Sequence, residues 1–145
     1  MQLRERIPNL SGATGWLNSE ITNNDIHEGK PILIHFWSVS CDSCVKSIPF
    51  IQSLLETQYD KIQVIAIHMP RSEKDKELDQ ITRKTAEYKM KQPIAIDNEY
   101  NLSKRFAVRH VPAYFLFDGS GLLRYKQSSG SVRLLKKRID RFVDA

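Results

Sequence analysis

Cys41 and Cys44 are the residues best suited to covalent chemistry, because they are the two cysteines of the 145-residue chain and stand three positions apart. They follow an apolar run, Ile32–Trp37, and precede apolar residues at helical spacing, which predicts a buried strand before the pair and a helix after it. The amide groups and the positive dipole end at a helix start stabilise an anion, so the first thiol should have a lowered pKa. We expect Cys41 to be the nucleophile and Cys44 to form or break a disulfide with it.

Other uses of a Cys-x-x-Cys pair need ligands that the sequence supplies poorly. A structural zinc site needs two further ligands, and the four histidines lack the spacing typical of zinc sites. Covalent haem attachment needs a histidine directly after Cys44, where Val45 stands. We therefore expect no metal and no other cofactor in the domain itself. Two alternatives stay open: a module that binds a metal or an iron–sulfur cluster with the cysteine pair, between two chains, and a thiol peroxidase.

The composition predicts one globular domain over residues 1–145. Hydrophobic residues make up 41% and charged residues 27% of the chain, which excludes a generally disordered protein. The longest apolar stretch, Ile32–Trp37, is far too short to cross a membrane. Residues 1–6 carry charge without a following apolar run, so we expect no secretory signal. Together with the small number of cysteines, this predicts a location in the reducing cytoplasm.

The net charge of +5 lies in the last part of the chain. From Arg124 to Ala145 there are seven basic and two acidic residues, whereas the bases and acids before Arg124 balance. Four apolar residues of this region recur at the spacing of a helix that faces a core: Val132, Leu135, Ile139 and Phe142. The basic residues then fall mostly on the solvated face of that helix. We therefore expect neither a nucleic-acid nor a membrane partner.

Strands and helices are expected to alternate along the chain. They are strands at 32–37, 62–68 and 93–96, helices at 41–57, 72–90 and 101–106, a hairpin of 113–117 with 122–127, and a last helix after residue 130. A parallel βαβ half followed by a ββα half predicts an α/β fold, with a central mixed sheet and helices on both faces. Residues 13–17 can add an edge strand.

Three segments carry a family resemblance that extends over nearly the whole chain. They are residues 36–44 (Phe-Trp-Ser-Val-Ser-Cys-Asp-Ser-Cys), 93–97 (Pro-Ile-Ala-Ile-Asp) and 111–121 (Val-Pro-Ala-Tyr-Phe-Leu-Phe-Asp-Gly-Ser-Gly). With them the chain resembles the TlpA/ResA-type thiol-disulfide oxidoreductases of the thioredoxin-like superfamily. The resemblance implies a thioredoxin-like three-layer α/β/α sandwich, a redox-active Cys41–Cys44 disulfide and a substrate-facing cis-proline at Pro112.

The resemblance also implies a mechanism and partners. The Cys41 thiolate attacks a substrate disulfide and Cys44 resolves the mixed disulfide, or the same residues oxidise substrate thiols in reverse. The substrates are disulfides of proteins or small molecules, a reductase is the redox partner, and we expect a monomer. Arg109 and His110, just before Pro112, either shape the substrate rim or are ordinary surface residues.

Four residues are expected to tune the pair: His35, Trp37, Asp42 and Arg71. His35 stands where thioredoxin has a buried aspartate, and Arg71 where ResA-type proteins have a glutamate. His35 either accepts the Cys44 proton as a neutral imidazole or only packs in the core. Asp42 should raise the pKa of Cys41 and Arg71 should lower it, with the helix start as the dominant influence. Trp37 is expected to belong to both the core and the wall of the site.

Overall fold

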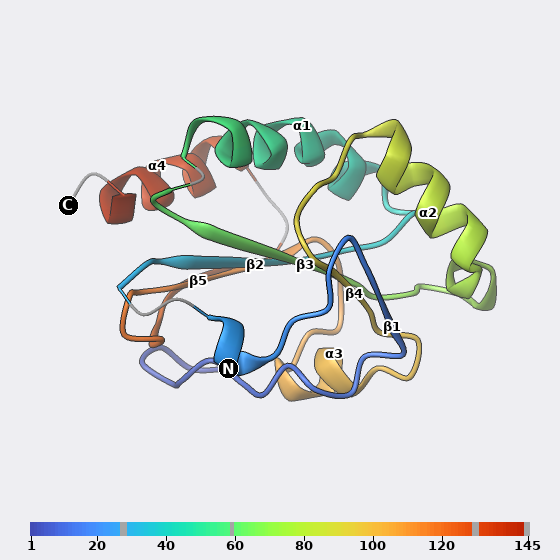
Figure 1. Cartoon of the computed structure of the whole chain (residues 1–145), viewed down its shortest axis with the longest axis horizontal. Coiled ribbons are helices and arrows are strands. Elements are labelled where there is room, and N and C mark those ends of the chain that lie inside the picture. Colours follow the sequence, from blue (N-terminus) through green and yellow to red (C-terminus); the bar gives the residue numbers. More distant parts are fainter. Residues whose placement is uncertain (27–28, 59, 129–130, 144–145) are drawn as a thin grey trace.

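Six strands form one mixed β-sheet in the computed structural model (Figure 1). The structure describes residues 1–26, 29–58, 60–128 and 131–143. Along the sheet the order is β1-β4-β3-β2-β5-β6, with β2, β3 and β4 parallel and the other pairings antiparallel. The strands are Gly15–Leu17 (β1), Ile32–Trp37 (β2), Gln63–His68 (β3), Ile94–Ile96 (β4), Ala113–Phe117 (β5) and Leu123–Ser128 (β6). The expected edge strand is therefore present as β1.

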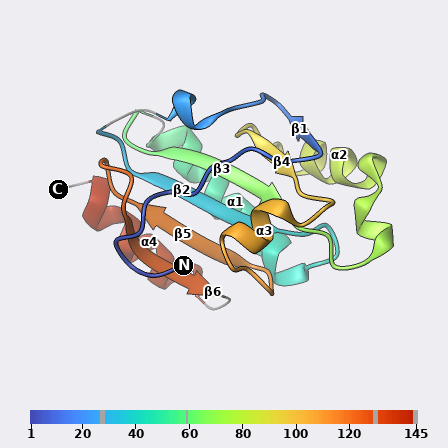
Figure 2. The ribbon, with the colours of Figure 1, turned by 90° about the horizontal axis from the view of Figure 1, so that it is seen from below.

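Helices cover both faces of the sheet. Helices α1 (Asp42–Thr57), α2 (Leu78–Glu87) and α4 (Val132–Val143) lie over one face (Figure 1). Helix α3 (Asn101–Arg105) and the N-terminal segment lie over the other face, which Figure 2 presents to the viewer. Two short 3-10 helices are Asn23–Asp25 (η1) and Glu73–Lys76 (η2). The arrangement confirms the α/β sandwich that the sequence predicts.

Strand β2 supplies side chains to both halves of the core, because successive side chains of a strand point to opposite faces. Ile34 and Phe36 pack with Leu102 of α3. Leu33 packs with residues of α1 and α4, and Trp37 packs with the two cysteines. All six residues of β2 are buried, which is typical of an interior strand and explains the continuous apolar run in the sequence.

The basic residues of α4 lie mostly on its exposed face, as the helical spacing predicts. Leu135 and Ile139 are fully buried beneath the helix, whereas Lys136 and Lys137 are exposed. Lys136 forms an ion pair with Asp140 at 2.9 Å. Among the helices of the described residues, none is both long enough and apolar enough to span a membrane.

The continuous helix expected over residues 72–90 is wrong. The structure has η2, then a break at Glu77 with extended backbone (φ −68°, ψ 117°), then the shorter α2. Leu78 and Ile81 recur at helical spacing, which predicts that both face the core, but Leu78 is 55% exposed while Ile81 is buried. The interruption accompanies the inward turn of Asp75, whose carboxylate binds the loop after β2. A tertiary contact therefore overrides the helical pattern at this point.

Candidate active site

Cys41 and Cys44 lie where β2 ends and α1 begins, and a disulfide bond joins them, with Cα atoms 5.2 Å apart. Cys41 is the N-cap residue of α1, and its Sγ accepts a hydrogen bond from the Cys44 backbone N–H at 3.2 Å. The Ser43 hydroxyl lies 3.5 Å from the same sulfur atom. The nucleophile expected from the sequence therefore stands at a helix N-terminus, beside two groups that can donate to it.

This position favours a thiolate on Cys41 once the disulfide is reduced. The Cys44 N–H and the positive end of α1 both stabilise negative charge at the Cys41 sulfur. Asp42, expected to oppose that charge, is exposed, so water screens its carboxylate. The geometry thus supports the expected dominance of the helix start.

A buried carboxylate holds the loop between β2 and Cys41. Asp75 is 3% exposed, and its Oδ2 accepts hydrogen bonds from the Ser38 hydroxyl at 2.9 Å and the Ser40 hydroxyl at 2.7 Å. The same oxygen accepts the Arg71 backbone N–H at 2.9 Å. Burial alone would raise the pKa of the Asp75 carboxyl, but these hydrogen bonds outweigh burial and hold that pKa below its usual value. The carboxylate therefore stays charged and anchors the residues directly before the nucleophile.

The His68 side chain, at the end of β3, anchors the same loop by binding the backbone of that loop. Its Nε2 accepts the Val39 N–H at 3.1 Å, which requires the proton of the neutral ring to lie on Nδ1. Burial lowers the pKa of His68 to about 4, although the Asp75 charge and a backbone hydrogen bond favour the protonated form. Trp37, a predicted site residue, is buried and packs edge-on against the His68 ring, with centroids 5.0 Å apart. A neutral imidazole therefore supports the middle of the loop.

His35 lies in β2 and forms its hydrogen bond with an amide. Its Nε2 lies 3.0 Å from Gln92 Nε2, and the amide donates to the neutral ring. Burial lowers the pKa of His35 to about 3. A ring with so low a pKa is a weak base, and the Gln92 amide already occupies its acceptor nitrogen. The structure therefore favours the packing role of His35 over acceptance of the Cys44 proton.

Hydrogen bonds tie β5 to the first turn of α1. The Val111–Pro112 peptide bond is cis, and Val111 packs against the cluster that contains both cysteines. The Tyr114 hydroxyl donates to Ser47 Oγ at 2.9 Å, and Ser47 Oγ donates to the Cys44 carbonyl at 2.8 Å. Burial raises the pKa of Tyr114, which keeps the phenol protonated as a donor. The segment that contains Pro112 is thus joined to the helix that carries the dithiol.

Arg71 reaches the site, as its position in the sequence predicts. Its Nη1 donates to the Ser40 carbonyl at 3.1 Å, while its backbone N–H binds Asp75. The side chain is exposed, and its positive charge lies at Ser40, the residue directly before Cys41. Arg109 and His110, the other predicted rim residues, are exposed and line a cleft with Arg71.

Sequence reasoning missed the buried polar groups that bind the loop before Cys41, the start of α1 or His35. They are His68, Asp75, Gln92, Ser47 and Tyr114. A histidine at the end of an otherwise apolar strand was the one signal available, for His68. Tyr114 stands in an apolar run that predicts its burial but not its hydrogen bond to Ser47. Asp75, Gln92 and Ser47 stand in stretches whose pattern gives no sign that they are buried.

Comparisons with known proteins agree with this geometry. Residues 3–126 match the AhpC/TSA family. The chain belongs to this family. The thiol-disulfide oxidoreductase YkuV of Bacillus subtilis (strain 168) is 41% identical over 142 residues, which are 97% of this chain and 96% of YkuV. The protein DipZ of Mycobacterium tuberculosis (strain CDC 1551 / Oshkosh) is 33% identical over 123 residues, which are 81% of this chain and 18% of DipZ.

Solved structures show the same fold. The solution structure of a thioredoxin-like protein in the oxidized form has a TM-score of 0.93 and 40% identity, and the match covers 99% of this chain and 98% of that one. The thioredoxin-like fold is confirmed, and with the Cys41–Cys44 pair these relatives show an oxidoreductase enzyme of the thiol–disulfide class.

Proposed function

We propose that this AhpC/TSA-family protein exchanges thiols and disulfides with protein substrates in the cytoplasm, as a monomer with a separate reductase as electron donor. In this proposal it needs no metal or other cofactor of its own and binds neither nucleic acid nor membranes. The position of Cys41 supports it most directly, because the Cys41 sulfur is the N-cap of α1 and accepts the Cys44 N–H at 3.2 Å.

The proposed reaction has two balanced steps. The Cys41 thiolate of the reduced enzyme attacks one sulfur of the substrate disulfide, which breaks that bond, forms a mixed disulfide and releases the other substrate sulfur as a thiolate. The Cys44 thiolate then attacks the Cys41 sulfur, releases the second substrate thiolate and leaves the Cys41–Cys44 disulfide. The released thiolates take protons from water, and the reductase returns the enzyme to its dithiol form. The reverse sequence oxidises a substrate dithiol.

Two single substitutions test the order of attack. Cys41→Ser should abolish reduction of a protein disulfide such as insulin. Cys44→Ser should also lose turnover but accumulate a mixed disulfide on Cys41, visible as a mass increase that dithiothreitol reverses. Mixed disulfides on Cys44 in a Cys41→Ser variant, at the same yield, would contradict the order.

The alternatives differ in simple readouts. Within the described residues, no group of three or more His, Cys, Asp or Glu side chains is placed to hold a metal. A cluster shared between two chains would still give a coloured or metal-loaded dimer after anaerobic purification. A thiol peroxidase would consume hydrogen peroxide faster than it reduces insulin. We expect a colourless monomer with two titratable thiols and the opposite order of rates.

A further inference from the structure

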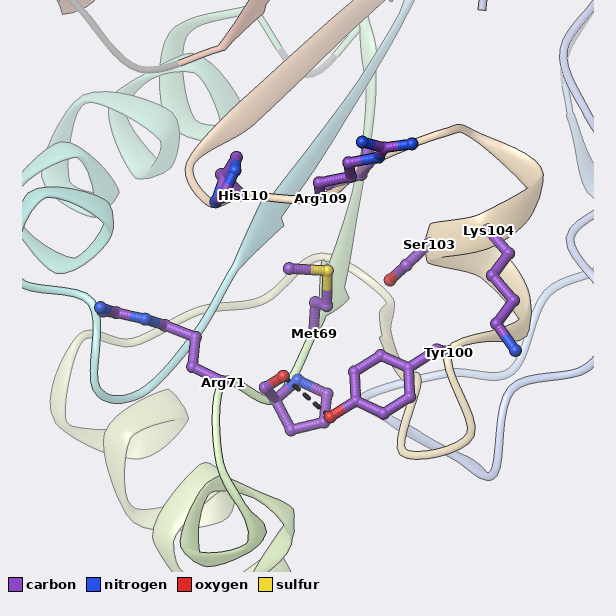
Figure 3. Close-up of a pocket in the computed structure, with 9 residues that line it drawn as sticks. Met69, Arg71, Tyr100, Ser103, Lys104, Arg109 and His110 are labelled. Carbon is purple, nitrogen blue, oxygen red and sulfur yellow. Dashed lines mark hydrogen bonds between the residues drawn. The ribbon is translucent and has the colours of Figure 1, made fainter.

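A cleft of about 450 Å³ lies beside the dithiol loop, which is residues 38–40 directly before Cys41 (Figure 3). Met69 and Tyr100 lie in its middle, with Arg71 on one side and Lys104 on the other, and Arg109 stands on the segment that leads to β5 (Figure 3). We call it the basic cleft. The end of β3, helix α3 and the segment before Pro112 therefore meet at one hollow of the surface.

The basic cleft carries positive charge with no carboxylate among its lining residues. Lys104 and Arg109 are exposed, and neither forms an ion pair with any residue that the structure describes. Asp97 is buried behind α3, and its oxygens already accept three hydrogen bonds from Leu102 and Ser103. The two free cations at the cleft thus lack a protein partner.

The walls of the cleft combine apolar and polar surface. Met69 is 6% exposed, and the Tyr100 hydroxyl donates to the Pro70 carbonyl at 3.2 Å, which joins α3 to the segment after β3. Such a surface, apolar in the middle and cationic around it, suits a peptide segment with an acidic side chain better than a free inorganic anion.

The basic cleft is also adjacent to the reacting sulfur atoms. Arg71 binds the carbonyl of Ser40, the residue before Cys41. Arg109 is two residues before Val111, which packs against the cysteine cluster. Because an extended residue spans about 3.3 Å, a chain bonded to Cys41 reaches the cleft within a few residues.

We propose that the basic cleft binds an acidic side chain of the substrate protein, close in sequence to the cysteine that Cys41 attacks. The cleft then selects protein disulfides flanked by Asp or Glu. This inference rests on the proposed thiol–disulfide exchange and adds a substrate class to it.

Two synthetic peptide disulfides test the selection, identical except for Glu or Gln beside each cysteine. With dithiothreitol as reductant, the protein should give a kcat/KM about four- to 25-fold higher for the Glu peptide, since Lys104 and Arg109 each contribute about two- to fivefold. The preference should shrink at high salt, because salt screens exposed charges. Equal rates for both peptides would overturn the cleft proposal, whereas reduction of neither peptide would overturn the proposed function instead.

Variants locate the preference on the molecule. The double variant Lys104→Gln, Arg109→Gln should bring the Glu-to-Gln ratio close to one. Lys137→Gln, which removes an exposed charge from α4 on the other face of the sheet, should keep the wild-type ratio. A double variant that retains the full ratio contradicts the proposal. The double variant should also be assayed with oxidised glutathione. If its kcat/KM fell more for oxidised glutathione than for the Glu peptide, the occupant would be a small anionic disulfide, and the proposal would be overturned.

Discussion

The two buried histidines, His35 on β2 and His68 on β3, show how differently the same residue type serves this site. Both rings are neutral because burial lowers their pKa values, to about 3 for His35 and about 4 for His68. His68 lies near the charged carboxylate of Asp75, and its ring binds the Val39 N–H of the loop before Cys41. His35 binds the side chain of Gln92, which lies outside that loop. The two neutral rings therefore differ in what they hold: His68 holds the loop before Cys41, whereas His35 holds Gln92.

What separates the two histidines is the loop of residues 38–40. Asp75 and His68 together hold three consecutive residues of it, through two hydroxyl groups and one backbone N–H. These anchors come from η2 and β3, so the nucleophile is positioned from outside its own helix. The hydrogen bond between His35 and Gln92 instead links β2 to the segment directly before β4. The comparison predicts that changes at the loop anchors affect the reaction, and that changes at His35 affect stability.

The largest expected effect is on stability in acid, and it concerns both histidines. Between a pH of about 6.5 and the folded pKa values of about 3 and 4, His35 and His68 are protonated in the unfolded chain but not in the folded chain. The free energy of unfolding should therefore fall as the pH drops from 6.5 toward 4, by about 1.4 kcal/mol per pH unit for each histidine. Urea unfolding at a series of pH values measures this slope, and a flat profile would contradict both assignments.

Asp75→Asn should have the next largest effect. The neutral amide is a weaker acceptor for the Ser38, Ser40 and Arg71 donors, and its NH₂ group adds a donor among them. We expect a loss of about 2 kcal/mol in unfolding free energy and a roughly tenfold slower attack by Cys41. Urea titration and stopped-flow reduction of a peptide disulfide measure the two quantities.

The matched control for this variant is Asp79→Asn, which removes an exposed carboxylate a few residues away. It should change the unfolding free energy by less than about 1 kcal/mol and leave the attack rate as it is. If both variants slowed the attack equally, the anchoring role of Asp75 would be wrong.

The smallest kinetic effect is expected for His35→Asn. A weak base whose acceptor nitrogen is already occupied by Gln92 contributes little to proton transfer from Cys44. Single-turnover release of the mixed disulfide should stay within about twofold of wild type in the folded variant, while His68→Asn slows the attack step. Markedly slower release in His35→Asn would restore the proton-acceptor role that the sequence left open.

Local pattern predicted most of the fold, because the interior strands are apolar runs buried on both faces. Strands β2 and β5 have the expected bounds, and Cys41 caps the expected helix. The support of the site could not be predicted in this way. Asp75 stands in a charged stretch and meets Ser38 from 37 positions away, and Gln92 meets His35 from 57 positions away. Contacts between such distant polar residues depend on how the elements pack, which no local pattern encodes.

The central claim, that the start of α1 makes Cys41 the nucleophile, is tested most directly by titrating that thiol. In a reduced Cys44→Ser variant Cys41 is the one remaining cysteine, and absorbance at 240 nm follows its ionisation. The helix N-terminus and the N–H of residue 44 predict an apparent pKa clearly below the ~8.5 of a free thiol. An apparent pKa at or above that value would contradict the account.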